Sequence, residues 1–142
     1  MILIREHFDL LFTTDCRYSR PIISGDSLRI CVRDLGLMEG HPLRTTRGPN
    51  LVNLPNCHFV FEQVRSSVRN LTPYIGNPIS GKFGPSYTEA DGPFSNNADS
   101  REYGFEGRLD DPPAFVDWTV NARCFMLEVP GARQGIGRRR RR

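Results

Sequence analysis

Apolar and polar residues alternate along two neighbouring stretches near the C-terminus, and this alternation is the strongest pattern in the chain. In residues 102–109, Tyr103, Phe105 and Leu109 are separated mainly by charged residues, and from Val116 to Cys124 the apolar positions alternate with polar ones in the opposite parity. A period of two places successive side chains on opposite faces of a strand. The segment between the arms, DDPP at 110–113, has a turn composition. The pattern predicts a β-hairpin over residues 102–129 with one buried face.

The parity of the two arms restricts how they pair. Directly opposed residues share a face of the sheet, so odd apolar positions of the first arm must oppose even positions of the second. A symmetric turn then predicts four pairs: Phe105 with Trp118, Tyr103 with Val120, Glu106 with Asp117 and Gly107 with Val116. Gly107 has no side chain, which leaves room for the Trp118 indole to cover the backbone there. Beyond Cys124 the apolar positions change parity, which predicts a bulge near Cys124 or a final stretch buried on both sides.

Similar but shorter patterns predict further strands. Leu28, Ile30 and Val32 alternate with polar positions, and residues 57–64, CHFVFEQV, are rich in aromatic and β-branched residues. Residues 64–71 fit either one or two helical turns or a bent strand, and residues 7–12 fit a first strand or the start of a short helix, of which we favour the strand. Glycine and proline mark 43–54 and 76–100 as loops, the second around one short strand near Tyr87.

These elements define the expected fold class. Several short strands, 13 Gly, 11 Pro and at most one short helix predict a mainly β protein, an antiparallel β-sandwich or open barrel of roughly six to eight strands. An α+β domain with one helix against the sheet is the alternative. We expect one globular domain over residues 1–130 and a flexible Gly/Arg-rich tail over 131–142. The expected core consists of Ile30, Phe59, Phe61, Tyr103, Phe105, Trp118 and Val120.

Composition and charge narrow the class of protein. The formal net charge is +3, and because the tail residues Arg138, Arg139, Arg140, Arg141 and Arg142 supply five positive charges, the rest of the chain carries −2. The early apolar run 1–4 is too short for a signal sequence or a membrane helix, which predicts a cytoplasmic protein. The four cysteines are widely spaced without a CxxC pair, so we expect buried thiols and neither a metal site nor a disulfide framework. No phosphate-binding or dinucleotide motif is present, so we expect no cofactor.

The face of the predicted hairpin opposite Trp118 is the candidate binding surface. Strand periodicity gathers acidic and polar side chains there, and the turn adds two more carboxylates at its tip; the candidate residues are Glu102, Glu106, Asp110, Asp111, Asp117 and Asn121. Like charges directly opposed across a sheet reduce stability, so the Glu106–Asp117 pair invites a functional explanation. A solvated sheet face, moderated by Arg108 and Arg123, is the alternative interpretation.

The sequence gives weaker support to two other functions, catalysis and nucleic-acid binding. Paired carboxylates for acid–base catalysis need a concave site, which a flat sheet face does not supply, and His58 in a predicted strand is more typical of a hydrogen-bonded structural histidine than of a catalytic one. We therefore expect no enzymatic activity. Arg65 and Arg69, spaced four apart, together with the arginine tail favour a nucleic-acid-binding alternative, because guanidinium groups bind phosphates and release counterions.

The order of CHFVFEQVRSSVRN, the TPYIG turn, DGPF, YGFEG and PPAFVDWTVNARCFMLEV over residues 57–129 resembles a group of small, mainly β bacterial domains of uncharacterised or immunity-protein type, which accompany polymorphic toxins. The resemblance rests on aromatic and turn positions. It implies a cytoplasmic protein that works by binding another protein. With the acidic face, it predicts a non-catalytic module that engages a basic toxin or another cationic partner.

Overall fold

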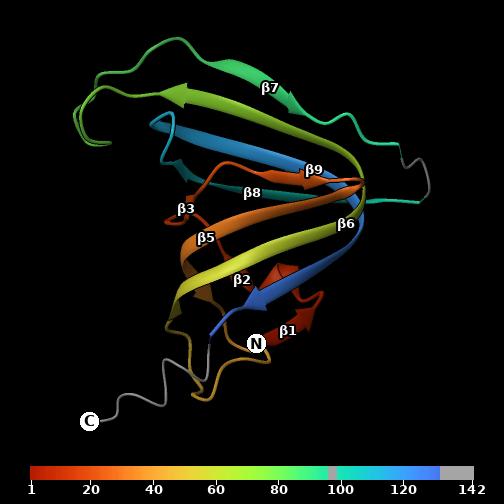
Figure 1. The fold of residues 1–142 in the computed structure, drawn as a ribbon. Coiled ribbons are helices and arrows are strands. Elements are labelled where there is room, and N and C mark those ends of the chain that lie inside the picture. The colour runs from red at the N-terminus through yellow and green to blue at the C-terminus, as the bar shows by residue number, and fades with distance from the viewer. Residues whose placement is uncertain (96–98, 132–142) are drawn as a thin grey trace.

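The structure, a computed structural model, describes residues 1–95 and 99–131, and these residues form mostly β-strands (Figure 1). In chain order the elements are β1 (Ile2–Arg5), a 3-10 turn (Phe8–Leu10), β2 (Leu11–Phe12), β3 (Arg17–Tyr18), β4 (Ile22–Ser24), β5 (Ser27–Leu37), β6 (Val52–Pro73), β7 (Tyr87–Asp91), β8 (Arg101–Leu109) and β9 (Ala114–Val129). The mainly β prediction is confirmed. Within the described residues the 3-10 turn is the only helical element, so the α+β alternative is wrong. None of the described helices is long and apolar enough to cross a membrane.

The nine strands of the described residues belong to one mixed sheet, which curls into a partial ring. Seven strands follow the order β1-β9-β8-β3-β5-β6-β7, and β2 and β4 each pair with β5 outside this path. An additional β6–β9 pairing joins two strands that lie apart in this order. The pairing of β3 with β8 is parallel, whereas the others are antiparallel. This arrangement corresponds to the open barrel that the sequence predicts, with nine strands rather than six to eight.

The long strands β6 and β9 bend at the same corner (Figure 1). Their register shifts between Val64 and Ser66 of β6, and Gln63 has a positive φ of 51°. On β9 the inward positions are even up to Ala122 and odd from Phe125 onward. The change of parity on β9 is confirmed, but the bulge expected near Cys124 is not on β9: Cys124 pairs in register with Glu62, and the register shift lies on β6 opposite Asn121 and Ala122. The bend folds the sheet over, so that its two halves enclose one core.

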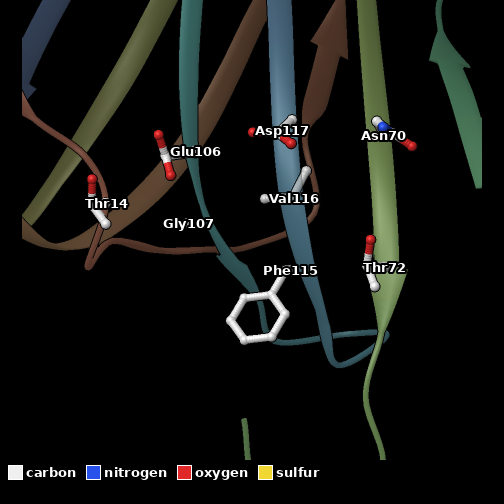
Figure 2. A pocket seen from close by; sticks show the side chains of 8 residues that line it. All are labelled: Thr14, Asn70, Thr72, Glu106, Gly107, Phe115, Val116 and Asp117. Carbon is white, nitrogen blue, oxygen red and sulfur yellow. The ribbon is translucent and has the colours of Figure 1, made fainter. Parts of the chain in front are cut away.

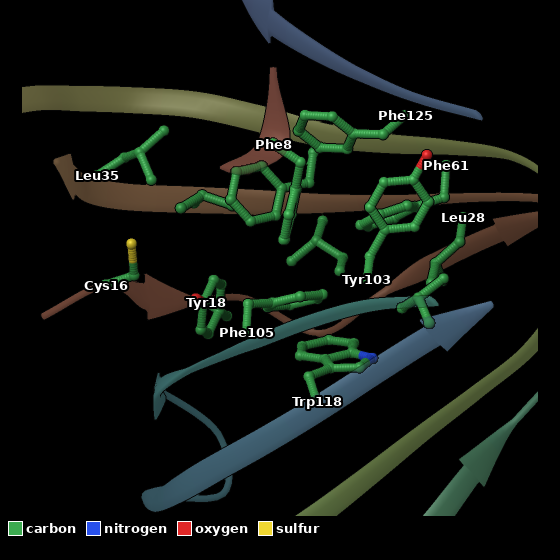
Figure 3. Packing of buried hydrophobic residues seen from close by; sticks show 14 of the residues in the cluster. Phe8, Cys16, Tyr18, Leu28, Leu35, Phe61, Tyr103, Phe105, Trp118 and Phe125 are labelled. Atoms are coloured by element: carbon green, nitrogen blue, oxygen red, sulfur yellow. The ribbon is translucent and has the colours of Figure 1, made fainter. Parts of the chain in front are cut away.

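The hairpin has the predicted register. Phe105 opposes Trp118, Glu106 opposes Asp117 and Gly107 opposes Val116. All seven expected core residues are buried, and the Phe105 and Trp118 rings stack with centroids 5.3 Å apart (Figure 3). Tyr18 and Phe8 complete this aromatic core, which the sequence pattern did not reveal.

The prediction that Trp118 covers Gly107 is wrong. A Cβ atom at Gly107 would lie 2.5 Å from the Cys16 carbonyl oxygen and 2.7 Å from the Tyr18 ring. The Tyr18 hydroxyl donates a hydrogen bond of 2.7 Å to the Glu106 carbonyl oxygen. Gly107 is therefore the point where β8 meets the segment that leads into β3.

The strand boundaries test four local predictions. Residues 64–71 continue β6 as a bent strand rather than a helix, and residues 52–54, expected in a loop, are its first residues. In the stretch 7–12, His7 precedes the 3-10 turn Phe8–Leu10, which is followed by the two-residue strand β2, so the strand that we favoured covers only Leu11 and Phe12. The short strand expected near Tyr87 is β7. Of the predicted tail, residues 132–142 lie outside the described residues.

Candidate functional site

The outer face of β8, β9 and β6 presents side chains in cross-strand rows, because directly paired residues point to the same side. One row consists of Glu106, Asp117 and Asn70. The neighbouring row consists of Arg108, Phe115 and Thr72. At the end near the bend, Glu102 opposes Asn121, and Asn121 opposes Ser66. We call Glu102, Glu106, Asp117 and Asn121 the acidic face.

A shallow groove of about 310 Å³ lies on this face. Its lining residues come from β6, β8, β9 and the segment before β3: Thr14, Asn70, Thr72, Glu106, Gly107, Phe115, Val116 and Asp117. Figure 2 shows Glu106 and Asp117 on adjacent strands, with Asn70 beside Asp117 on the next strand. The contact between Gly107 and Cys16 holds Thr14 near this groove, and Thr13 accepts the Glu106 backbone N–H at 3.3 Å. The same strand, β8, therefore contacts both the core residue Tyr18 and the segment that brings Thr14 to the groove.

The carboxylates of the acidic face differ from most others in the described chain in having no arginine partner. Eight carboxylates form ion pairs with arginine, namely those of Glu6, Asp9, Asp34, Glu89, Asp91, Asp110, Asp111 and Glu128. Within residues 1–95 and 99–131, no ion pair involves Glu102, Glu106 or Asp117, although Arg108 lies in the row next to Glu106. The Glu106–Asp117 pair therefore places two negative charges on adjacent strands with no ion-pair partner among the described residues.

The two carboxylates at the hairpin tip are separate from this surface. Asp110 forms an ion pair with Arg33, and Asp111 lies 3.6 Å from Arg20. Both arginines come from strands or loops far earlier in the chain, which a sequence pattern cannot reveal. Asn121 shares the face as predicted, and its amide donates a hydrogen bond of 3.2 Å to the Ser66 hydroxyl.

The two arginines of the nucleic-acid alternative have different environments. Arg65 is exposed at the register shift, whereas Arg69 faces inward and is 9% exposed. The Arg69 guanidinium binds the Asp91 carboxylate at 2.8 and 3.2 Å and lies 5.2 Å from the centroid of the Trp118 ring. Since Asp91 also accepts the Ser67 hydroxyl, Arg69 belongs to a buried polar network. Arg138 to Arg142 lie outside the described residues.

His58 is close to a carboxylate but does not bond to it. Its Nδ1 lies 3.5 Å from Glu128 Oε1, and this buried nitrogen has no hydrogen-bond partner among the described residues, contrary to the hydrogen-bonded histidine that we expected. Burial, with the Arg29 charge, lowers the pKa of His58. Hydrogen bonds from Arg29 lower the pKa of Glu128, because they stabilise the carboxylate. Glu128 is thus engaged by Arg29.

An aromatic cluster of Tyr74, Phe83 and Phe115 borders the groove. The ring centroids are 5.2 Å apart for Tyr74 and Phe115 and 6.0 Å apart for Phe83 and Phe115. Phe83 and Phe115 are exposed and Tyr74 is half-buried. Sequence reasoning missed this cluster, for which the main signal was an aromatic residue at an outward position of β9.

The side chains of the described residues do not form a cluster suited to a metal ion. Across residues 1–95 and 99–131, no three His, Cys, Asp or Glu side chains are grouped so that they could hold one.

In comparisons with known proteins, the chain matches no family model, no curated protein and no solved structure.

Proposed function

We propose that this chain is a non-catalytic, cytoplasmic binding module that captures a cationic protein through its acidic face. The observation that carries the proposal is the direct opposition of Glu106 and Asp117, neither of which pairs with an arginine of the described residues. The chain has 19 basic residues, and eight of its carboxylates pair with arginines of the described residues. Directly opposed like charges without such a partner lower the stability of the sheet, so we infer that this pair serves binding. A cation placed between the two carboxylates attracts both of them and so offsets their mutual repulsion.

The resemblance over residues 57–129 to immunity-type domains suggests which class of protein the partner belongs to. If it holds, the partner is a basic toxin, and the module is an immunity-type inhibitor that covers the toxin's nucleic-acid-binding cleft. An acidic surface suits this role, because complementary charge speeds encounter with a cationic partner and disfavours wrong partners.

The test uses isosteric neutralisation and a simple cationic probe. The double variant E106Q/D117N keeps side-chain shape and removes both charges, and E39Q is the matched control because Glu39 is an exposed carboxylate in the turn after β5. Binding of a capped octa-arginine peptide is measured by NMR titration at about 20 and about 200 mM salt. We expect the wild type and E39Q to bind with strong salt dependence, and E106Q/D117N to lose most of the affinity. Equal affinity in all three proteins refutes the proposal.

A stability measurement separates lost binding from lost folding. Removing either carboxylate relieves the cross-strand repulsion, so the neutralised variants are expected to gain up to about 0.5 kcal/mol in the free energy of unfolding while they lose affinity. Urea denaturation measures this gain. A variant that loses both stability and affinity would indicate that the carboxylates are structural.

A further inference from the structure

The groove joins two kinds of surface that recognise different parts of one ligand. Glu106 and Asp117 line it from β8 and β9, and Phe115 lines it from β9, two residues before Asp117 (Figure 2). The Phe115 side chain is 36% exposed, and Phe83 beside it is 51% exposed. Carboxylates and accessible rings are therefore adjacent on one face.

Hydrogen bonds hold the aromatic cluster in place. Tyr74 pairs with Phe83 in an isolated bridge, and the Ile75 N–H donates to the Lys82 carbonyl oxygen at 2.9 Å. The Gly84 N–H donates to the Pro73 carbonyl oxygen at 2.9 Å. These bonds fix the backbone that carries the rings beyond the end of β6. A ligand that packs on the rings therefore has to order little of the protein when it binds.

We propose that this groove binds an arginine side chain of a partner protein, with an apolar neighbour of that arginine packed on the Tyr74, Phe83 and Phe115 cluster. The inference rests on the proposed function and specifies its ligand. A guanidinium is planar, carries five donors and stacks on rings, so it can bind carboxylates on two strands while it contacts Phe115. A lysine ammonium is a compact, strongly hydrated charge that gains less from the ring. The exposed area of Phe83 then accepts the apolar neighbour.

Three capped peptides of equal length test the arginine contact and the apolar contact separately. One contains arginine followed by leucine, the second replaces arginine with lysine, and the third replaces leucine with serine; binding to the full chain is measured by NMR titration at low salt. The arginine–leucine peptide is expected to bind about two- to fivefold more tightly than the lysine peptide, from the ring contact. A loss of about threefold or more is expected for the serine peptide, from the lost apolar contact.

Variants connect these preferences to the groove. F83S should abolish the preference for leucine over serine while leaving the salt-dependent attraction, and L51S is the control, because Leu51 is a 46% exposed apolar residue just before the other end of β6. R108Q should strengthen binding of all three peptides, because it removes a cation from the row beside Glu106. Equal binding of the three peptides, or equal effects of F83S and L51S, overturns this inference while the acidic-face proposal stands. Unchanged binding in E106Q/D117N overturns both.

Discussion

Replacing Gly107 with alanine tests how the core and the groove are held together. The added Cβ would lie 2.5 Å from the Cys16 carbonyl oxygen and 2.7 Å from the Tyr18 ring, far inside van der Waals contact. The Cys16 carbonyl oxygen cannot move away without weakening hydrogen bonds. It accepts the Arg108 N–H at 3.0 Å, and the Cys16 N–H donates to the Thr13 carbonyl oxygen at 2.9 Å. Gly107 also has a φ of +156°, which a residue with a side chain rarely adopts.

The magnitude follows from three separate costs. Overpacking costs about 1–3 kcal/mol, the strained backbone costs about 1–3 kcal/mol, and weakening the Tyr18 hydrogen bond to Glu106 costs about 1 kcal/mol. Because one backbone shift relieves part of each, we expect a total near 3–5 kcal/mol. That loss is a large fraction of the stability of a single domain.

Urea denaturation monitored by the fluorescence of Trp118, the single and buried tryptophan, measures the loss. Gly104→Ala is the matched control: it lies on the same strand, and nothing lies within 4 Å of a Cβ added there. We expect G104A to change stability by less than about 1 kcal/mol. If G107A is as mild as G104A, the segment before β3 is not fixed against β8, and the close contact at Gly107 does not hold Thr14 at the groove.

Three further predictions test other parts of the structure. R69A should lower the free energy of unfolding by about 3–5 kcal/mol, measured in urea, because it leaves a buried carboxylate without its cation. In native protein at about pH 8, a thiol reagent should react rapidly with two cysteines and with all four only in urea, since burial protects the others; the reactive pair is Cys31 and Cys124. Arg29 lowers the pKa of Glu128 from 4.5 in the folded state, so this contribution is present above about pH 4.5 and is lost as the pH falls through the folded pKa. Urea midpoints between about pH 3 and 6 should therefore fall less steeply for E128Q than for the wild type.

The hairpin could be predicted from the sequence because its constraints are local. Parity fixes which residues share a face, and a short turn fixes which of them meet, so the pairs from Tyr103 to Gly107 follow without any other part of the chain. The same parity predicts that Tyr103, Phe105 and Trp118 are buried, as they are. The mainly β class followed from several such stretches.

The remaining features depend on residues far apart in the chain. Tyr18 is buried at 0% exposure, yet it lies in a two-residue strand too short to show a period. Asp110 and Arg33 are 77 positions apart, so the turn position of Asp110 adds it to the candidate surface without revealing its partner. The spacing of four predicts that Arg69 shares a helix or strand face with Arg65, whereas the β6–β9 pairing places Arg69 beside Trp118 in the interior.

Which carboxylates of the predicted surface have arginine partners also determines how the proposed ligand would change the stability of the fold. The sequence places six residues on the predicted surface, and arginines pair with the two carboxylates at the hairpin tip. Of the predicted surface, Glu102, Glu106 and Asp117 are therefore the carboxylates that form no ion pair with an arginine of the described residues. Glu106 and Asp117 are directly opposed like charges, so a guanidinium bound as we propose would attract both carboxylates and thereby offset their mutual repulsion. Any ligand that binds only the folded state raises stability in proportion to the logarithm of its concentration over its dissociation constant. Octa-arginine should therefore raise the melting temperature of the wild type by more than that of E106Q/D117N, and this difference measures how far the like-charge pair contributes to the proposed binding.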